Sequence, residues 1–239
     1  MAVLPRRRVP VRQVLYRQEV DEMKKYLVLA VAIAALTACA AIRNPAPVAV
    51  YDFGLQPLPV EPSAAETGGN RQLRTSLLVT DTIAPAWLDS TAIHYRLAYD
   101  DPTRFLAYRS SRWASTPAKL LTQRVRTRIA ALNEGGVMNT GEGAHADYIL
   151  RVDLEEFAQV FDTPSRSSAI VQLRASLIDR TTRYPVSQRS FGVEVPAPTA
   201  NAAGAVKALT EASDQLIESL VGWLEQELRD KGKKDFSGG

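Results

Sequence analysis

The chain has 239 residues, of which 46% are hydrophobic, and a formal net charge of +3, a composition typical of globular proteins. Residues 1–39 hold seven basic and three acidic residues, which leaves 22 Lys and Arg against 23 Asp and Glu in the remainder. Global charge therefore gives no support for a nucleic-acid partner, and one cysteine excludes internal disulfides as the basis of the fold.

Residues 23–38 have the three-part layout of a secretory signal peptide. Lys24 and Lys25 precede an apolar run at 26–36, which is shorter than the roughly 20 residues that a membrane-spanning helix needs. The run ends in Leu-Thr-Ala-Cys, which resembles a bacterial lipobox. In such sequences the cysteine sulfur receives a diacylglycerol, the chain is cut before that cysteine, and the new amine is acylated. We expect this at Cys39; a small buried hydrophobic cysteine is the alternative.

Residues 1–22 fit poorly in front of this signal. Glu19, Asp21 and Glu22 stand directly before Met23, where a signal peptide needs positive charge. We therefore expect 1–22 to be an upstream extension and Met23 to be the true start. A longer n-region that is still cleaved is the alternative.

Residues 39–48 are predicted to form a lipid anchor with a Pro- and Ala-rich tether, followed by one domain at 49–229. In the first part of this domain, strand-like patterns stand at 51–55, 73–83, 92–99 and 103–113. A Pro- and Gly-rich stretch at 56–70 predicts an exposed loop. The turn residues at 100–102 predict a hairpin between the last two of these strands.

A helix is predicted to follow, with Thr116 as N-cap and Pro117 as its first residue. Its apolar stripe consists of Leu121, Val125, Ile129 and Leu132, and Gly135-Gly136 ends it. Arg124 and Arg128 fall on the opposite side, which we interpret as solvated. An acidic partner or lipid headgroups facing these basic residues is the alternative.

The second half alternates in three runs, at 148–154, 171–177 and 187–195, which predicts half-buried antiparallel strands. A long amphipathic helix is expected at 205–229, and a disordered tail at 230–239. The helical stripe comprises Val206, Leu209, Ser213, Leu216, Leu220, Leu224 and Leu228. The sequence therefore predicts one α/β domain of α+β character, with a mixed, mostly antiparallel sheet packed with two main amphipathic helices.

Residue types that carry catalysis are scarce in this chain. Its two histidines are His94, which we expect to be an exposed strand residue, and His145, in a loop. Two histidines do not make a metal site, and Glu155-Glu156 should point to opposite faces of a strand. Phosphate-binding glycine motifs are not present. We therefore expect no enzymatic activity, no metal and no cofactor besides the lipid on the cysteine.

The order of these features resembles a known family. A lipobox, a "YDFG" strand, the stretch "LLVTDTIAPAWLDSTAIHYRLAYDDPTRFLAYRSSRW", the strand "DLEEF" and a long C-terminal helix are similar to the ABC-type transport auxiliary lipoproteins. These are outer-membrane partners of paraquat-inducible-type and other MCE (mammalian cell entry) lipid transport systems. The turn at 85–89, the strand at 93–96, and Tyr108 with Trp113 are the most specific parts.

The resemblance implies a periplasm-facing domain that is tethered to the outer membrane and docks on an MCE-domain protein. Ala40, in place of an aspartate, fits outer-membrane delivery under the sorting rule of such lipoproteins. Exposed aromatic and arginine side chains often dominate binding energy, although an aromatic residue beside a strand is as often core. The candidate partner-binding residues are Trp87, Leu88, Tyr95, Arg96, Tyr108 and Trp113.

Two other classes of function stay open. An envelope assembly lipoprotein would share the anchor and the fold but serve another outer-membrane machine. A periplasmic lipid carrier would hold an acyl chain in an apolar cavity between sheet and helix, whereas a docking protein would expose an apolar patch. Association of the chain with copies of itself is also left open.

Overall fold

The computed structural model describes residues 47–55, 75–133, 135–139 and 145–237, with side chains as far as Lys231. The chain divides into two units at Pro47, and the second unit, from Val48 onward, holds the fold. The predicted signal peptide, Cys39 and the predicted loop at 56–70 lie outside the described residues.

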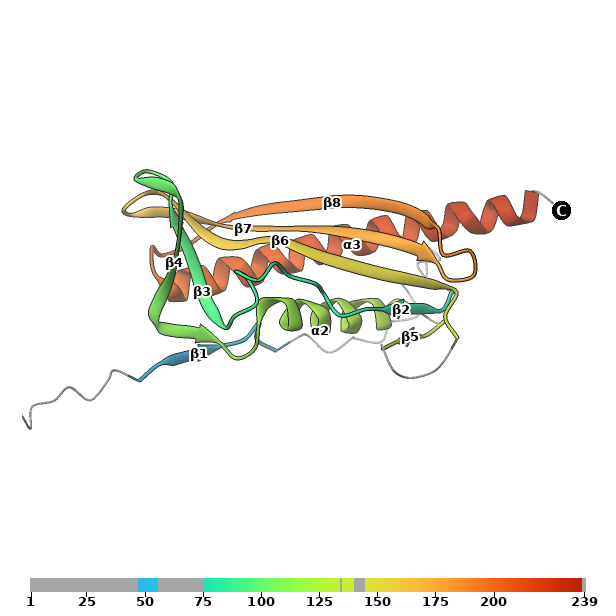
Figure 1. Ribbon diagram of the computed structural model, residues 1–239, viewed down its shortest axis with the longest axis horizontal. Coiled ribbons are helices and arrows are strands. Elements are labelled where there is room, and N and C mark those ends of the chain that lie inside the picture. Colours follow the sequence, from blue (N-terminus) through green and yellow to red (C-terminus); the bar gives the residue numbers. More distant parts are fainter. Residues whose placement is uncertain (1–46, 56–74, 134, 140–144, 238–239) are drawn as a thin grey trace, which may run out of the picture. The chain divides into compact units, whose positions relative to one another are not determined.

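The described residues form eight strands in one mixed sheet, and two helices (Figure 1), which confirms the α/β prediction. The strands are β1 (Ala49–Tyr51), β2 (Leu77–Val79), β3 (Ala92–Leu97), β4 (Asp101–Trp113), β5 (Val137–Met138), β6 (Tyr148–Thr163), β7 (Arg166–Asp179) and β8 (Pro185–Pro196). The helices are α2 (Pro117–Ala130) and α3 (Ala202–Ser237).

The long strand β6 organises the sheet. On one edge it pairs antiparallel with β7, which in turn pairs antiparallel with β8. On its other edge it pairs parallel with β2 near its start and with β3 near its end. The predicted hairpin of β3 and β4 is confirmed, and β1 adds to β4 in parallel. The most extensive pairings are thus antiparallel, as expected.

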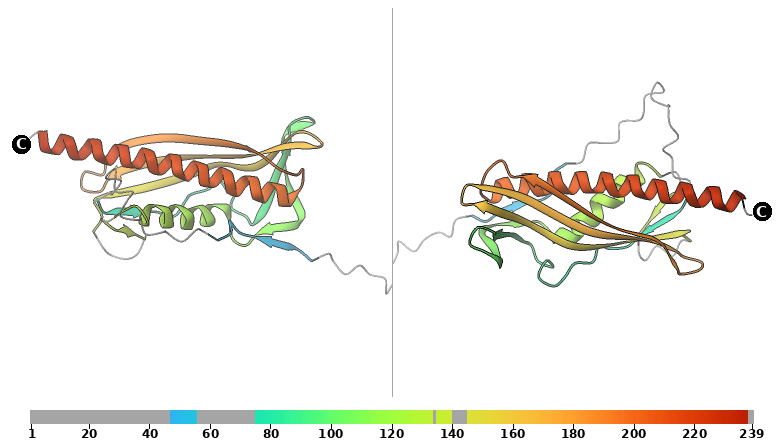
Figure 2. Two further views of the ribbon diagram at one scale, coloured as in Figure 1. Left: turned by 180° about the vertical axis from the view of Figure 1, so that it is seen from behind. Right: turned by 90° about the horizontal axis from the view of Figure 1, so that it is seen from above.

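Helix α3 covers one face of β6, β7 and β8, and α2 lies beside it (Figures 1 and 2). Alternating residues of β6 and the stripe of α3 meet in one core, in which Leu154, Phe157, Leu216 and Leu220 are all at most 2% exposed. A bulge between Leu154 and Glu156 resets the alternation, so that Leu154 and Phe157, three residues apart, both face inward.

Two predicted strands differ from those in the structure. The strand predicted at 51–55 shares only Tyr51 with β1, and the strand predicted at 73–83 is reduced to β2. After β1 the chain leaves the sheet where Asp52 Oδ1 accepts the N–H of Gly54 at 2.8 Å, and Gly54 has a φ of 71°, a value that glycine adopts without a steric penalty. After β2 only Ile83 makes an isolated bridge, to Asp153. The intervening Thr82 N–H donates to Thr122 Oγ1 of α2.

Helix α3 is longer than predicted. It begins at Ala202 and runs to Ser237, and so includes most of the segment at 230–239 for which we expected a disordered tail. The physical reason is that Gly232 is the single helix-breaking residue between Arg229 and Ser237. One glycine costs a helix only about 1 kcal/mol.

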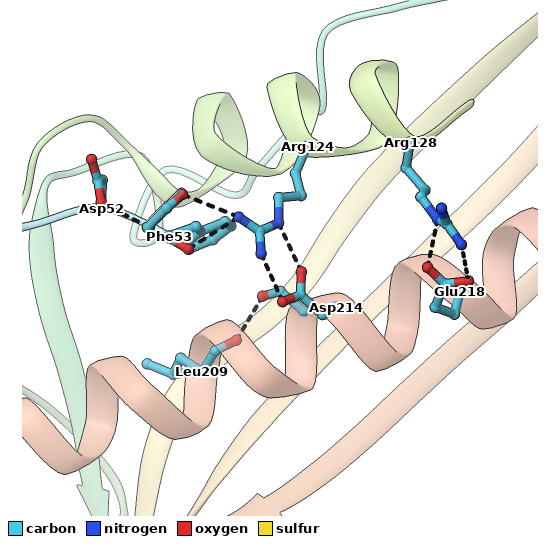
Figure 3. Close-up of polar contacts among 9 residues, drawn as sticks. Asp52, Phe53, Arg124, Arg128, Leu209, Asp214 and Glu218 are labelled. Carbon is cyan, nitrogen blue, oxygen red and sulfur yellow. Dashed lines mark hydrogen bonds and ion pairs between the residues drawn. The ribbon is translucent and has the colours of Figure 1, made fainter. Parts of the chain in front are cut away.

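The prediction of a solvated basic face on α2 is wrong for Arg124, whose side chain is 11% exposed. Its guanidinium donates two bonds of 2.7 Å to the Asp214 carboxylate of α3 and one of 3.0 Å to the Phe53 carbonyl (Figure 3). One helical turn further on, Arg128 pairs with Glu218 of α3. The acidic partner of this basic face is therefore the protein's own C-terminal helix.

Replacing Arg124 by Ala is expected to lower the free energy of unfolding by about 2 kcal/mol, because it removes the charge-assisted hydrogen bonds that a guanidinium only 11% exposed donates to Asp214 and to the Phe53 carbonyl. The matched variant Arg128→Ala should cost less than about 1 kcal/mol, because both members of that pair are at least 42% exposed and solvent screens it. Urea unfolding followed by circular dichroism measures both. Equal losses for the two variants would contradict the assigned role of Arg124.

Candidate functional site

Two of the six candidate partner-binding residues are buried in the core. Leu88 is 0% and Trp113 1% exposed, and the Trp113 ring contacts Phe53 and Phe157 at centroid distances of 5.5 and 5.8 Å. The expectation that Leu88 and Trp113 offer binding surface is therefore not supported by their position. Both side chains belong to the hydrophobic core, where the burial of their apolar surface stabilises the fold.

Tyr95 and Tyr108 form a half-buried aromatic pair between β3 and β4. Their ring centroids are 4.8 Å apart, and the Tyr108 hydroxyl donates to Gln159 Oε1 at 2.5 Å. Gln159 is itself fully buried and donates to Ser167 Oγ. Burial raises the pKa of Tyr108 to about 12, so its hydroxyl stays protonated and serves as a fixed donor.

Arg96 lies close to that pair in sequence but is held by its own contacts. Its Nη2 is 3.1 Å from Glu156 Oε2, and its guanidinium carbon is 4.5 Å above the centre of the Phe105 ring. These contacts fix the guanidinium in a partly exposed position. Arg96 is thus ordered in advance of any partner, which lowers the entropy cost of binding.

Trp87 is the candidate that the structure exposes most, at 58%. It lies in the turn between β2 and β3 that the Leu88 N–H closes by donating to the Pro85 carbonyl. Ile83, four residues earlier, is 50% exposed. We call the segment 83–87, which carries these two exposed apolar side chains, the exposed turn. Sequence reasoning missed Ile83, because its place in an alternating run predicted a strand residue.

A pocket of about 700 Å³ lies next to the exposed turn, between residues 81–84 and the first turns of α2. Ile83 lines it on one side, and its charged lining residues are Asp81, Asp89, Lys119 and Arg126. Arg126 is fixed there by Asp81 and by the Val79 carbonyl. The pocket thus combines apolar surface with charged side chains.

The two histidines lie apart from each other and do not build a catalytic centre. His94 is half-buried rather than exposed, stacks on Phe105 at 4.2 Å, and has Nε2 at 3.1 Å from Ser90 Oγ. Burial lowers the pKa of His94, partly offset by the Leu106 backbone and the Glu156 charge. Catalytic Ser–His pairs use a carboxylate that holds the imidazole, and no carboxylate bonds to His94 within the described part of the chain.

The described residues contain no group of three or more His, Cys, Asp or Glu side chains that could hold a metal ion. No helix within the same ranges is long and apolar enough to cross a membrane.

Solved structures with the same fold exist. A Xanthomonas campestris protein of the domain family DUF330 matches with a TM-score of 0.65 and 23% identity, over 78% of this chain and 99% of that one. A second, uncharacterized protein matches with a TM-score of 0.56 and 14% identity, over 74% and 99%. A search of curated proteins gave no match. At these identities the structural likenesses establish the fold.

Family models identify both parts of the chain. Residues 23–40 match the prokaryotic membrane lipoprotein lipid attachment site, which indicates a membrane-anchored lipoprotein. Residues 54–221 match the ABC-type transport auxiliary lipoprotein component, a range that holds β2 to β8, α2 and the first part of α3. The family implies association with an ABC-type transport system. The chain belongs to the ABC-type transport auxiliary lipoprotein family.

Proposed function

We propose that this protein is a non-catalytic docking component of an MCE-type ABC lipid transport system, anchored in the outer membrane and facing the periplasm. Three observations support the proposal: the family to which the chain belongs, the lipid attachment site, and the exposed turn. The exposure of Trp87 carries it furthest, because it gives the domain a place at which a partner protein can bind.

The anchor that we propose is a diacylglycerol and an N-acyl chain on Cys39. A single acyl chain holds a protein on a membrane only reversibly, whereas two or more hold it durably. Ala40 follows the cysteine, and the lack of an aspartate there favours the outer membrane. Anchored in this way, the domain would stand at the receiving or delivering end of an assembly that conducts lipids between the two membranes.

The exposed turn has the properties of a protein-docking site. Trp87 projects from a turn whose next residue, Leu88, is buried, so the indole is presented on a rigid base. Tryptophan is the residue type most enriched at binding hot spots, and its pre-ordered position reduces the cost of binding. The charged side chains at the neighbouring pocket, Asp81, Asp89, Lys119 and Arg126, provide the polar rim that surrounds such hot spots.

The packing between the sheet and α3 favours docking over lipid carriage. Leu209, Leu216, Leu220 and Leu224 of α3 are all 0% exposed and belong to one core with the sheet. A carrier would need an apolar cavity at that position, and these side chains occupy it.

The experiment is a pull-down of the tagged chain from solubilised envelopes after mild cross-linking, with mass spectrometry of the partners. An MCE-domain protein should be recovered with the native chain and with the control Tyr184→Ala, which changes a 75% exposed aromatic residue elsewhere. Trp87→Ala should reduce recovery by about tenfold or more, the loss typical of a hot spot.

The outcomes separate the partner from the docking surface. Recovery of an unrelated outer-membrane machine, without an MCE-domain protein, would replace the proposal by the assembly-lipoprotein alternative. Undiminished recovery of an MCE-domain protein with Trp87→Ala would keep the partner and move the docking surface away from the exposed turn.

A further inference from the structure

The edge of the sheet nearest the lipid anchor in sequence exposes apolar and basic side chains together. β1 pairs parallel with β4, with Val50 beside Arg112 and Tyr51 beside Trp113. Because side chains alternate along a strand, Tyr51 and Trp113 face the core, and Val48, Val50 and Arg112 share the outer face. Val48 is 46% and Val50 53% exposed. Arg109, three residues before Arg112 on β4, is exposed as well, and we call Val48, Val50, Arg109 and Arg112 the edge patch.

The arginines of the edge patch are exposed and carry uncompensated charge. Within the described residues neither Arg109 nor Arg112 has a carboxylate partner, unlike Arg96, Arg104 and Arg124. The nearest acidic residue along β1 is Asp52, whose carboxylate accepts the Gly54 N–H. The tether at 40–47 adds Arg43 and no acidic residue. The region is therefore net positive.

The length of the tether keeps the edge patch close to the bilayer. Val48 is nine residues after Cys39, and an extended chain spans at most about 3.3–3.6 Å per residue, or roughly 30 Å in all. A lipidated cysteine thus keeps β1 within about 30 Å of the headgroups. Where the edge patch comes within about a Debye length of the surface, the negative potential of anionic lipids acts on its basic side chains.

We propose that the edge patch rests on an anionic phospholipid surface. Arg109 and Arg112 would bind lipid phosphates, a geometry that guanidinium groups favour, while Val48 and Val50 enter the boundary between headgroups and acyl chains. This contact orients the domain, with the turn between β7 and β8, at the other end of the sheet from β1, held away from the bilayer (Figures 1 and 2). The inference depends on the lipid anchor and not on the proposed transport partner.

The single cysteine makes a site-specific test practical. With the sulfur of Cys39 acylated, a Val50→Cys variant has one free thiol, which is labelled with the polarity-sensitive fluorophore NBD. The lipidated full chain is then reconstituted in vesicles of phosphatidylcholine with phosphatidylglycerol, or of phosphatidylcholine alone. Tyr184→Cys, at an exposed position in the turn between β7 and β8, is the control.

The label at Val50→Cys is expected to show a blue shift and brighter emission in the anionic vesicles, a smaller change in the neutral ones, and a partial loss at high salt. Adding Arg109→Gln and Arg112→Gln should remove the dependence on anionic lipid. The label at Tyr184→Cys should keep the emission of a water-exposed fluorophore.

Two results would overturn the proposal. One is identical emission from the two labelled positions in anionic vesicles. The other is a shift at Val50→Cys that ignores lipid charge and grows with the number of protein molecules per vesicle. That second result would assign the edge patch to contact between copies of the chain.

Discussion

The double variant Leu216→Asp with Leu220→Asp is expected to abolish folding of the domain. Both leucines are 0% exposed on α3, and a carboxylate placed at either position would be buried without a partner. Each such group costs several kcal/mol, whether it stays charged or takes up a proton, in addition to the lost apolar contacts. Together these losses equal or exceed the roughly 5–15 kcal/mol by which domains are stable.

Thermal unfolding followed by circular dichroism measures this effect, and Ser219→Asp is the matched control. Ser219 lies on the exposed side of the same helix, so the same new charge there should change the free energy of unfolding by no more than about 0.5 kcal/mol. A cooperative transition at the native temperature in the double variant would mean that α3 does not pack on the sheet.

Replacement of Cys39 by Ser is expected to release the protein from membranes without loosening its fold. The experiment places the variant behind a signal peptide that is cleaved without lipidation, so that an uncleaved leader does not hold the chain. Without acyl chains, only weak and salt-sensitive contacts with the bilayer remain. The described fold begins beyond Cys39, so its unfolding temperature should not change.

Fractionation of cells after a high-salt wash, together with incorporation of labelled palmitate, measures the anchor. The native chain should stay with the membranes and carry label, and the variant should be soluble and unlabelled. Ala41→Ser, two residues after the cysteine, should behave as the native chain does. Salt-resistant membrane retention of the Cys39→Ser variant would show that another part of the chain is the anchor.

Hydrophobic periodicity was enough to predict most of the architecture. The period of two in Leu150, Val152 and Leu154 identified a half-buried strand, and the stripe from Leu209 to Leu228 identified the long helix. The α/β class and the hairpin of β3 and β4 followed from the same local signals. Periodicity did not predict that β2 is reduced to Leu77–Val79. The hydrogen bond from the Thr82 N–H to Thr122 Oγ1 of α2 interrupts that strand, and Thr122 is distant in sequence.

The candidate surface was less predictable than the fold. Trp87 and Leu88 are adjacent in one turn. Trp113 is a tryptophan like Trp87, so residue type alone predicts a binding role for both. Yet Trp87 is 58% exposed, whereas Leu88 and Trp113 are buried. An aromatic side chain gains from burial and from binding by the same physical effect. Only the position of the backbone relative to the core decides between the two.

By itself, the sequence determined the features that depend on local order along the chain: the signal peptide with its cysteine, the strand and helix periods, and the family. Only the tertiary structure decided which charges are compensated and which side chains reach the surface. Arg124 is neutralised by Asp214, ninety residues away, while Arg112 is left exposed beside Val50. The reason is that ion pairing and burial depend on distances in space, which the packing of α2, α3 and the sheet creates.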